Sequence, residues 1–196
     1  MESVLARETR FDTALTEVAS RIDDFTRFPA GHSERVAELA GRLAREFHLA
    51  DEDRRVLETA ALIRDIGELR MSRDYIAAPR ILTAEERLDL RRHPVIGEQE
   101  AASLKLGRDV QLVVRWHHEW WNGKGYPDEL TGETIPLKAR ILRVADAWCA
   151  LLSPRPFRAA YPAETARKYL IEWAAIEFDP AVVKAHLDLL EADALT

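Results

Sequence analysis

The sequence predicts a single all-α domain, and three observations support this fold class. Apolar residues recur at three- and four-residue steps along almost the whole chain, which is the spacing of one helix face. Strands are not evident in the pattern. A chain of 196 residues, 47% of them hydrophobic, is long enough for one substantial core, and its size favours one domain over two. We expect one compact bundle of about eight or nine helices.

We expect residues 1–30 to form a helix and a connection, and residues 31–196 to form the main helical domain. The apolar positions of this first helix are Leu5, Phe11, Leu15, Val18 and Ile22. Two further helices follow, because the same spacing continues. Their apolar faces carry Val36, Leu39, Ala40, Leu43 and Phe47, and then Leu57, Ala60 and Ala61.

Capping residues predict where several helices begin. Asp51 is expected as an N-cap, and Thr83 with Glu86 has the spacing of a capping box that starts a helix running toward His93. Pro136 suits the first turn of a helix that continues through Leu152. Two closing helices are expected near 163–176 and 180–192. The one long irregular segment is 118–135, and a loop of that length in a compact helical protein is usually functional.

Charge and cysteine content narrow the class of protein. The net charge is −6, the isoelectric point is near 5.6, and the arginines are dispersed, so an extended nucleic-acid surface has little support. The single cysteine, Cys149, cannot form an intramolecular disulfide. No leader or long apolar run is present, so we expect a cytoplasmic protein without a membrane partner. The oligomeric state stays open.

The candidate chemistry is a metal site. His117 and His118 stand where a predicted helix gives way to the long loop, and at a helix end both imidazoles can turn into one pocket. Asp65 and Asp146 lie on apolar helices, where a buried carboxylate needs a metal or a cation as partner. Imidazoles with carboxylates suit iron, manganese or zinc, and a two-metal arrangement suits phosphodiester hydrolysis.

Each of these residues also has a purely structural interpretation. His32 and His93 could be hydrogen-bonded structural groups, as buried polar groups usually are. Asp65 could pair with an arginine. Four histidines (His32, His93, His117, His118) fit one constellation, whereas His48 and His186 lie outside it.

Five segments, in their order along the chain, resemble the HD-GYP family, a branch of the HD-domain metal phosphohydrolases whose active members linearise cyclic di-GMP. The segments are GHSERVAELA at Gly31, RDIGE at Arg64, HPVIGE at His93, HHEWWNGKGYP at His117 and ILRVADAWCALLSPRPFR at Ile141. The resemblance extends from about Phe11 to Leu190 and implies an HD-domain helical bundle with a long GYP loop.

Carried over position by position, the resemblance implies a divalent metal, iron or manganese, and a set of site residues. The implied metal ligands are His32, Asp65, His93, His117, His118 and Asp146. The implied catalytic positions are Asp65 and Glu68, and the implied ligand-binding positions are Gly125, Tyr126 and Pro127 of the GYP loop with Arg155 and Arg158. An arginine fork suits phosphate binding, although the prolines near these two arginines also suit a solvated surface turn.

Three positions depart from the family pattern. Arg64 stands where the HD histidine is expected, Glu68 replaces a lysine, and Ala78 replaces the lysine expected before Pro79. An arginine stays protonated and has no lone pair for a metal, so at least one metal position should fail. We expect the guanidinium to enter the pocket and neutralise Asp146, Asp65 or Glu68, and the four-residue spacing predicts an Arg64–Glu68 pair. The alternative is a surface position for Arg64 on a shifted helix.

Two functions follow from different classes. The first is a degenerate HD-GYP domain that binds a cyclic dinucleotide or a signalling protein, through a GYP loop with exposed aromatics at Trp120, Trp121 and Tyr126, and has weak or no phosphodiesterase activity. The second is an active metal-dependent cyclic di-GMP phosphodiesterase with a reduced metal site, since one bound metal can lower the pKa of water to about 7. The loop aromatics could also be plain packing, as we expect for Trp116.

Overall fold

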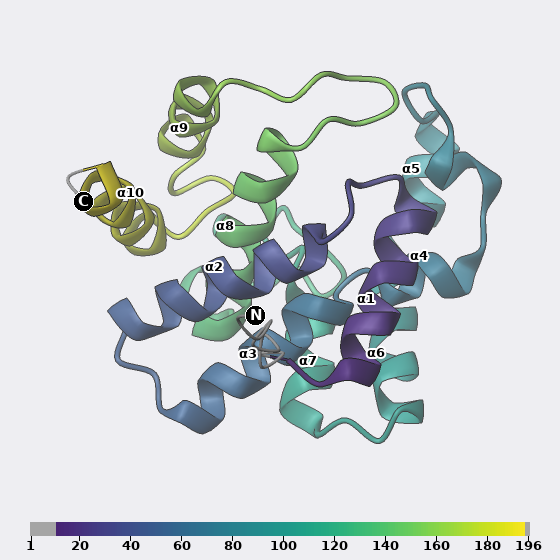
Figure 1. The fold of residues 1–196 in the computed structure, drawn as a ribbon, viewed down its shortest axis with the longest axis horizontal. Helices are drawn as coiled ribbons and strands as arrows, with labels where there is room; N and C mark the ends of the chain where they lie inside the picture. Colours follow the sequence, from purple (N-terminus) through teal and green to yellow (C-terminus); the bar gives the residue numbers. More distant parts are fainter. Residues whose placement is uncertain (1–10, 195–196) are drawn as a thin grey trace, which may run out of the picture.

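The computed structural model describes residues 11–194, which form ten α-helices, two 3-10 helices and no strand (Figure 1). The all-α prediction is confirmed. Leu5, predicted in the first helix, lies outside the described residues. The α-helices are α1 (Thr13–Thr26), α2 (His32–Glu46), α3 (Asp51–Ile63), α4 (Ile66–Met71), α5 (Ala84–Leu90), α6 (His93–Ser103), α7 (Arg108–Trp116), α8 (Leu137–Leu152), α9 (Ala163–Glu172) and α10 (Pro180–Ala194), and the 3-10 helices are η1 (Asp74–Ala77) and η2 (Gly132–Thr134).

Two interruptions explain why the described residues form more helices than the eight or nine expected. The chain leaves the helix after Ile63, so α4 is a separate short helix. The helix expected to run from Thr83 toward His93 ends at Leu90, and α6 begins anew at His93. The proline that follows His93 lacks a backbone N–H and suits only the first turn of a helix, which explains the second interruption.

The predicted helix starts agree with the structure to within one residue. Thr83 accepts a hydrogen bond from the Glu86 amide, and the Glu86 carboxylate accepts one from the Thr83 amide, which completes the capping box. Pro136 is the N-cap of α8 rather than a residue of its first turn, so that prediction was wrong by one position, whereas α8 ends at Leu152 as expected. Asp51 is the first residue of α3 rather than its N-cap, so that prediction was wrong by one position.

The core lies where α2, α3 and α8 meet. These three helices occupy the middle of the molecule, with α4, α5 and α6 on one side and α9 and α10 on the other (Figure 1). Fully buried residues on the shared faces include Val36, Leu43, Leu57, Ile141 and Leu142. None of the described helices has the length and apolar character needed to cross a bilayer.

The N-terminal helix α1 packs on α2, α3 and α4. Its Ile22 is buried in the core, and its Asp23 carboxylate accepts hydrogen bonds from the Ser33 amide at 3.1 and 3.2 Å and from the Ser33 hydroxyl at 2.6 Å. This helix therefore buttresses the start of α2. The boundary expected at residue 30 stays a prediction.

The helices α4 and α6 touch through their backbones. A Cβ atom added at Gly67 would lie 2.0 Å from the His93 carbonyl oxygen and 2.8 Å from the Gly97 amide nitrogen. Only glycine fits at such a distance. This contact holds Asp65, at the start of α4, beside His93, at the start of α6.

Candidate metal centre

Helix ends bring four of the predicted ligands together. Asp65, His93, His117 and His118 each offer a ligand atom, and these four atoms lie within 4.8 Å of one another. Asp65 precedes α4, His93 begins α6, and the two other histidines follow α7. The Asp65 Oδ1 lies 3.7 Å from His93 Nε2 and 3.6 Å from His117 Nε2. The predicted convergence is therefore present for this half of the site.

The hydrogen bonds of His93 and His117 prepare both rings to bind a cation. Each Nδ1 lies beside a backbone carbonyl, that of Leu90 at 2.7 Å and that of Val114 at 2.6 Å, and so carries the proton that it donates. Both Nε2 atoms are then left with lone pairs, and they face each other at 3.3 Å. A carbonyl partner at the far nitrogen is the usual support of a metal-bound imidazole. These residues fit a divalent cation.

The electrostatics also favour a metal. Burial, together with the neighbouring His117, lowers the pKa of His93 to about 4, so this ring is neutral at physiological pH. Burial alone would raise the pKa of Asp65, but the adjacent Arg64 charge outweighs burial and holds it well below its ordinary value. The cluster therefore offers the neutral His93 imidazole and an ionised carboxylate, which suit iron, manganese or zinc.

His118 is held differently from the other two imidazoles. The Arg143 Nη1 lies 3.1 Å from His118 Nδ1, so that nitrogen accepts a hydrogen bond and the proton resides on Nε2. Burial also lowers the pKa of His118 well below its ordinary value. His118 can join the other ligands only when Arg143 releases its Nδ1.

Arg64 is the largest fully buried side chain among the described residues, with 1% of its surface exposed. Its Nε donates to Asp146 Oδ1 at 2.6 Å, and its Nη2 lies 3.2 Å from Asp65 Oδ2. Its Nη1 donates to the Ala61 carbonyl at 3.0 Å and to the Ser33 hydroxyl at 3.3 Å. The surface alternative for this residue is wrong. The interpretation of Asp65 as an arginine partner is therefore confirmed, and its role as a metal ligand stays a prediction.

The predicted ion pair between Arg64 and Glu68 was wrong, because the guanidinium turns to the two aspartates instead. The four-residue spacing would face both side chains the same way only along one continuous helix. Here α3 ends at Ile63 and α4 begins at Ile66, so Arg64 lies in the turn between the two helices while Glu68 lies in α4. Glu68 is half-buried, and burial with the nearby Asp65 charge raises its pKa to about 8. Its catalytic role stays a prediction.

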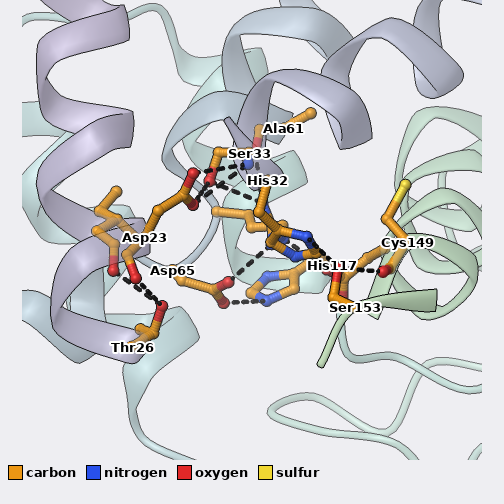
Figure 2. A network of polar contacts seen from close by, with 12 residues as sticks. Asp23, Thr26, His32, Ser33, Ala61, Asp65, His117, Cys149 and Ser153 are labelled. Carbon is orange, nitrogen blue, oxygen red and sulfur yellow. Dashed lines mark hydrogen bonds and ion pairs between the residues drawn. The ribbon is translucent and has the colours of Figure 1, made fainter. Parts of the chain in front are cut away.

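His32 lies on the Arg64 side of the site. Its ring stacks on Phe28 with centroids 3.7 Å apart and planes 6° apart. Its Nδ1 lies 3.3 Å from the Ser153 hydroxyl, which in turn donates to the Cys149 carbonyl, so the imidazole donates to Ser153 (Figure 2). Burial, reinforced by Arg64, lowers the pKa of His32 to about 3. The Nε2 lone pair of His32 is buried without a hydrogen-bond partner.

Asp146 is held between two arginines, Arg64 from the turn between α3 and α4 and Arg143 from α8. Besides Arg64, the Arg143 Nη1 lies 3.6 Å from Asp146 Oδ2. Burial would raise the pKa of Asp146, but the two arginine charges outweigh it, so the carboxylate is ionised. Arg143 also pairs with the buried Glu177. Sequence reasoning missed Arg143, although its spacing of three residues from Asp146 on one apolar helix was a usable signal.

The GYP loop packs onto the metal centre. A Cβ atom at Gly125 would lie 2.2 Å from the Trp120 amide nitrogen. Only glycine at position 125 therefore lets the loop pack this closely against Trp120. The Tyr126 ring stacks on His118 with centroids 4.9 Å apart, and the peptide bond before Pro127 is cis. The Glu119 carboxylate, which sequence reasoning also missed, accepts hydrogen bonds from two loop amides.

The loop aromatics are half-buried rather than exposed, which corrects the expectation. Trp120 packs edge-on against Trp173 with centroids 5.9 Å apart, and Trp121 lies under the Arg140 guanidinium. Trp116 donates its indole N–H to Asp128 at 2.7 Å. These rings therefore pack against α8, α9 and the loop itself, which agrees with the alternative interpretation.

The two predicted phosphate-binding arginines have different environments. Arg158 donates to the carbonyls of Ala150, Leu151 and Ala159, so its guanidinium is engaged in holding the end of α8. Arg155 lies 3.6 Å above the Phe28 ring, and its Nη1 is buried without a hydrogen-bond partner. Burial lowers the pKa of Arg155 although Glu68, Asp65 and Asp146 lie within electrostatic range. Of the two, Arg155 has the free donor.

Comparison with known proteins agrees with this architecture. The family model described as "HD domain" matches residues 18–182. The chain is 37% identical over 183 residues to a cyclic di-GMP phosphodiesterase response regulator RpfG from Xanthomonas campestris, and 35% identical over 179 residues to the 3'3'-cGAMP-specific phosphodiesterase 3 from Vibrio cholerae. These alignments cover 92% and 90% of this chain but 48% and 39% of the relatives.

Solved structures show the same fold. The crystal structure of a cyclic GMP-AMP-specific phosphodiesterase from V. cholerae superposes with a TM-score of 0.72 over 91% of this chain and 48% of that chain, at 19% identity. The HD domain of the phosphodiesterase PgpH from L. monocytogenes superposes with a TM-score of 0.62 over 93% of this chain and 98% of that chain, at 15% identity. The family match, the relatives and the order of the motifs agree: the chain belongs to the HD domain family, in its HD-GYP branch.

Proposed function

We propose that this HD-GYP domain binds a cyclic dinucleotide and has weak or no phosphodiesterase activity, because Arg64 holds the place of one metal ion. The observation that carries this proposal is the buried guanidinium that pairs with both Asp65 and Asp146. A divalent cation would compensate the same two carboxylates. The unpartnered Nε2 of His32 on the same side of the site supports this interpretation, since a metal would use that lone pair.

A fixed arginine does not replace a metal in the chemistry. Its charge repels a cation at that position, and its nitrogen atoms have no lone pair to offer. Two-metal hydrolysis of a phosphodiester needs an ion at both the attacking and the leaving oxygen. With one position filled by Arg64, the two carboxylates keep a positively charged partner, but the site loses half of that arrangement.

The other half of the site supports a single divalent ion, iron or manganese. Asp65, His93 and His117 would hold it, and His118 would join if Arg143 released its Nδ1. Such an ion, when bound, would lower the pKa of a coordinated water toward about 7. Glu68, with its raised pKa, holds a proton near Asp65 at neutral pH, where the family pattern has a lysine charge.

The ligand class rests on the relatives and on Arg155. Curated relatives at 37% and 35% identity are named for cyclic di-GMP and 3'3'-cGAMP. The buried, unpartnered Nη1 of Arg155 can donate to a phosphate oxygen, and the Phe28 ring beneath it holds the guanidinium in place. A signalling protein that contacts the GYP loop is a further candidate partner.

An active phosphodiesterase with a reduced metal site is the alternative function. The four-residue ligand group favours it, because one ion can already activate a water. The two functions differ in turnover rather than in binding. The chain spans less than half of the length of the two relatives named above, so this proposal concerns the domain and not a complete signalling protein.

The test is metal stoichiometry, cyclic di-GMP binding and cyclic di-GMP turnover, measured anaerobically on the parent and on variants. We expect at most one ion and little turnover in the parent, a second ion in Arg64→His, and turnover in the double variant Arg64→His/Glu68→Lys, where the lysine can neutralise phosphate charge. Arg70→His on the exposed side of α4 is the matched control and should behave as the parent. Substantial turnover by the parent would contradict the proposal in favour of the alternative.

A further inference from the structure

A cavity of about 550 Å³ lies between α2, α8 and α10 and is lined by none of the six predicted metal ligands. Its volume is in the range of small-molecule sites. Leu39, Trp148, Leu152 and Leu190 form its apolar wall. Figure 1 shows α10 at the edge of the molecule beside α2 and α8, whereas the metal centre lies toward α4, α6 and α7.

A buried polar side chain with no partner lines this cavity. His186 on α10 is 1% exposed, and both of its ring nitrogens are buried without a hydrogen-bond partner. Buried polar groups are nearly always hydrogen-bonded, because a donor or an acceptor that is buried without a partner is destabilising. The ring is not used by the core except through edge-on packing against Trp148, with centroids 4.6 Å apart. This imidazole therefore has a free donor and a free acceptor.

The charges at the cavity favour an anion. Arg35 and Arg42 both line it, with Glu38 as the one carboxylate beside them. Arg42 pairs with Asp193 at 2.7 Å, but both side chains are well exposed, and such pairs contribute little. Arg42 is close enough to His186 to add to the effect of burial, which lowers the pKa of that imidazole to about 4. A negative group between the two would be stabilised by the arginine charge and by the imidazole N–H.

A metal ion is a poorer occupant than an organic anion. The nearby thiol of Cys149 would have to ionise to bind a metal, and burial raises its pKa to about 12. His186 alone cannot hold an ion. The apolar wall and its indole ring suit a ligand with an aromatic body, because aromatic rings pack edge-to-face against Trp148 and fill the space between the leucines.

We propose that this cavity is a binding site for a small aromatic acid, whose ring lies against Trp148 and the leucines and whose carboxylate or sulfonate lies between Arg42 and His186. The site is independent of the metal centre and of the proposed function, since it uses different residues. It assigns a ligand to the one buried histidine that the family pattern leaves unexplained.

The experiment uses 8-anilinonaphthalene-1-sulfonate, an aromatic sulfonate whose fluorescence rises in an apolar site, titrated into the whole chain. We expect saturable binding of one molecule per chain. The variant Leu190→Trp fills the cavity and should weaken binding at least tenfold. His186→Leu keeps the volume but removes the hydrogen bond, and should weaken binding by roughly 3- to 10-fold, the factor that corresponds to one hydrogen bond. Arg42→Gln should weaken it by a similar factor.

Matched controls place the same changes outside the cavity. Ile171→Trp adds a tryptophan on the exposed face of α9, and Arg55→Gln removes one exposed arginine on α3. Both should bind the probe as the parent does. In addition, the ring resonances of His186, assigned by their loss in His186→Leu, should shift on saturation. Binding of several probe molecules per chain, an equal effect of Leu190→Trp and Ile171→Trp, or unmoved His186 resonances would each overturn the proposal.

Discussion

Removing the Arg64 charge tests how the centre is held together. In Arg64→Met, Asp65 and Asp146 would keep side chains that are only 11% and 13% exposed but lose their shared cation. Removing one partner of a buried ion pair costs about 3–5 kcal/mol of stability, because the remaining charge stays desolvated. For a chain of this size each kcal/mol lowers Tm by about 2–4 °C, so we expect a fall of about 6–20 °C.

Urea unfolding followed by circular dichroism measures this loss, with Arg64→Met/Asp146→Asn as the second arm. The double variant removes one of the two carboxylates that lose Arg64 and should recover part of the loss, with a coupling energy of about 1–3 kcal/mol. Arg55→Met on the exposed face of α3 is the control, and its effect should stay within about 0.5 kcal/mol. A loss below about 1 kcal/mol in Arg64→Met, with no recovery in the double variant, would refute the idea that this guanidinium takes the place of a cation.

Three further outcomes follow from contacts elsewhere. The pKa of His186 is about 4 in the folded chain and 6.5 ordinarily, so the unfolded chain binds the proton first as pH falls. The free energy of unfolding should therefore decrease between pH 6.5 and 4 by about 1.4 kcal/mol per pH unit for this group. Urea unfolding across that range should show a weaker pH dependence of stability in His186→Leu. Gly125→Ala should cost about 1–3 kcal/mol in thermal unfolding and weaken manganese binding in calorimetry, whereas Gly107→Ala, with no atom within 4 Å of its new methyl group, should do neither. Arg158→Met should lower Tm by about 2–8 °C, because the carbonyls at the end of α8 lose their donors, and an unchanged Tm would show that water serves them equally well.

The fold class and half of the site could be predicted because both depend on local pattern. Helical spacing predicts the bundle, and the adjacent histidines beside a glycine-rich loop predict the ligand group around Asp65. Thr83 and Pro136 are also local signals, and both helices begin within one residue of the expected position. These features need no knowledge of what the helices pack against.

The rest could not be predicted because it depends on how separate helices meet. Arg64 pairs with Asp146 rather than with Glu68 because the helix is interrupted between α3 and α4. The apolar pattern continues across this interruption, so the sequence does not predict it. The burial of Trp120 depends on Trp173, which is far away in the sequence. His186 lies among apolar residues on its helix, so the sequence predicts an ordinary core position. Only the packing of α2, α8 and α10 leaves its ring nitrogens at a cavity without a hydrogen-bond partner.

The backbone contact between Gly67 and His93 means that the ligand group is preorganised by packing rather than by its metal. Since α4 and α6 cannot move apart without breaking that contact, Asp65 and His93 keep their separation whether or not an ion is bound. Metal binding would then cost little ordering entropy, and the empty and loaded states should have nearly the same backbone. The arginine that occupies the proposed second position therefore leaves this half of the centre assembled.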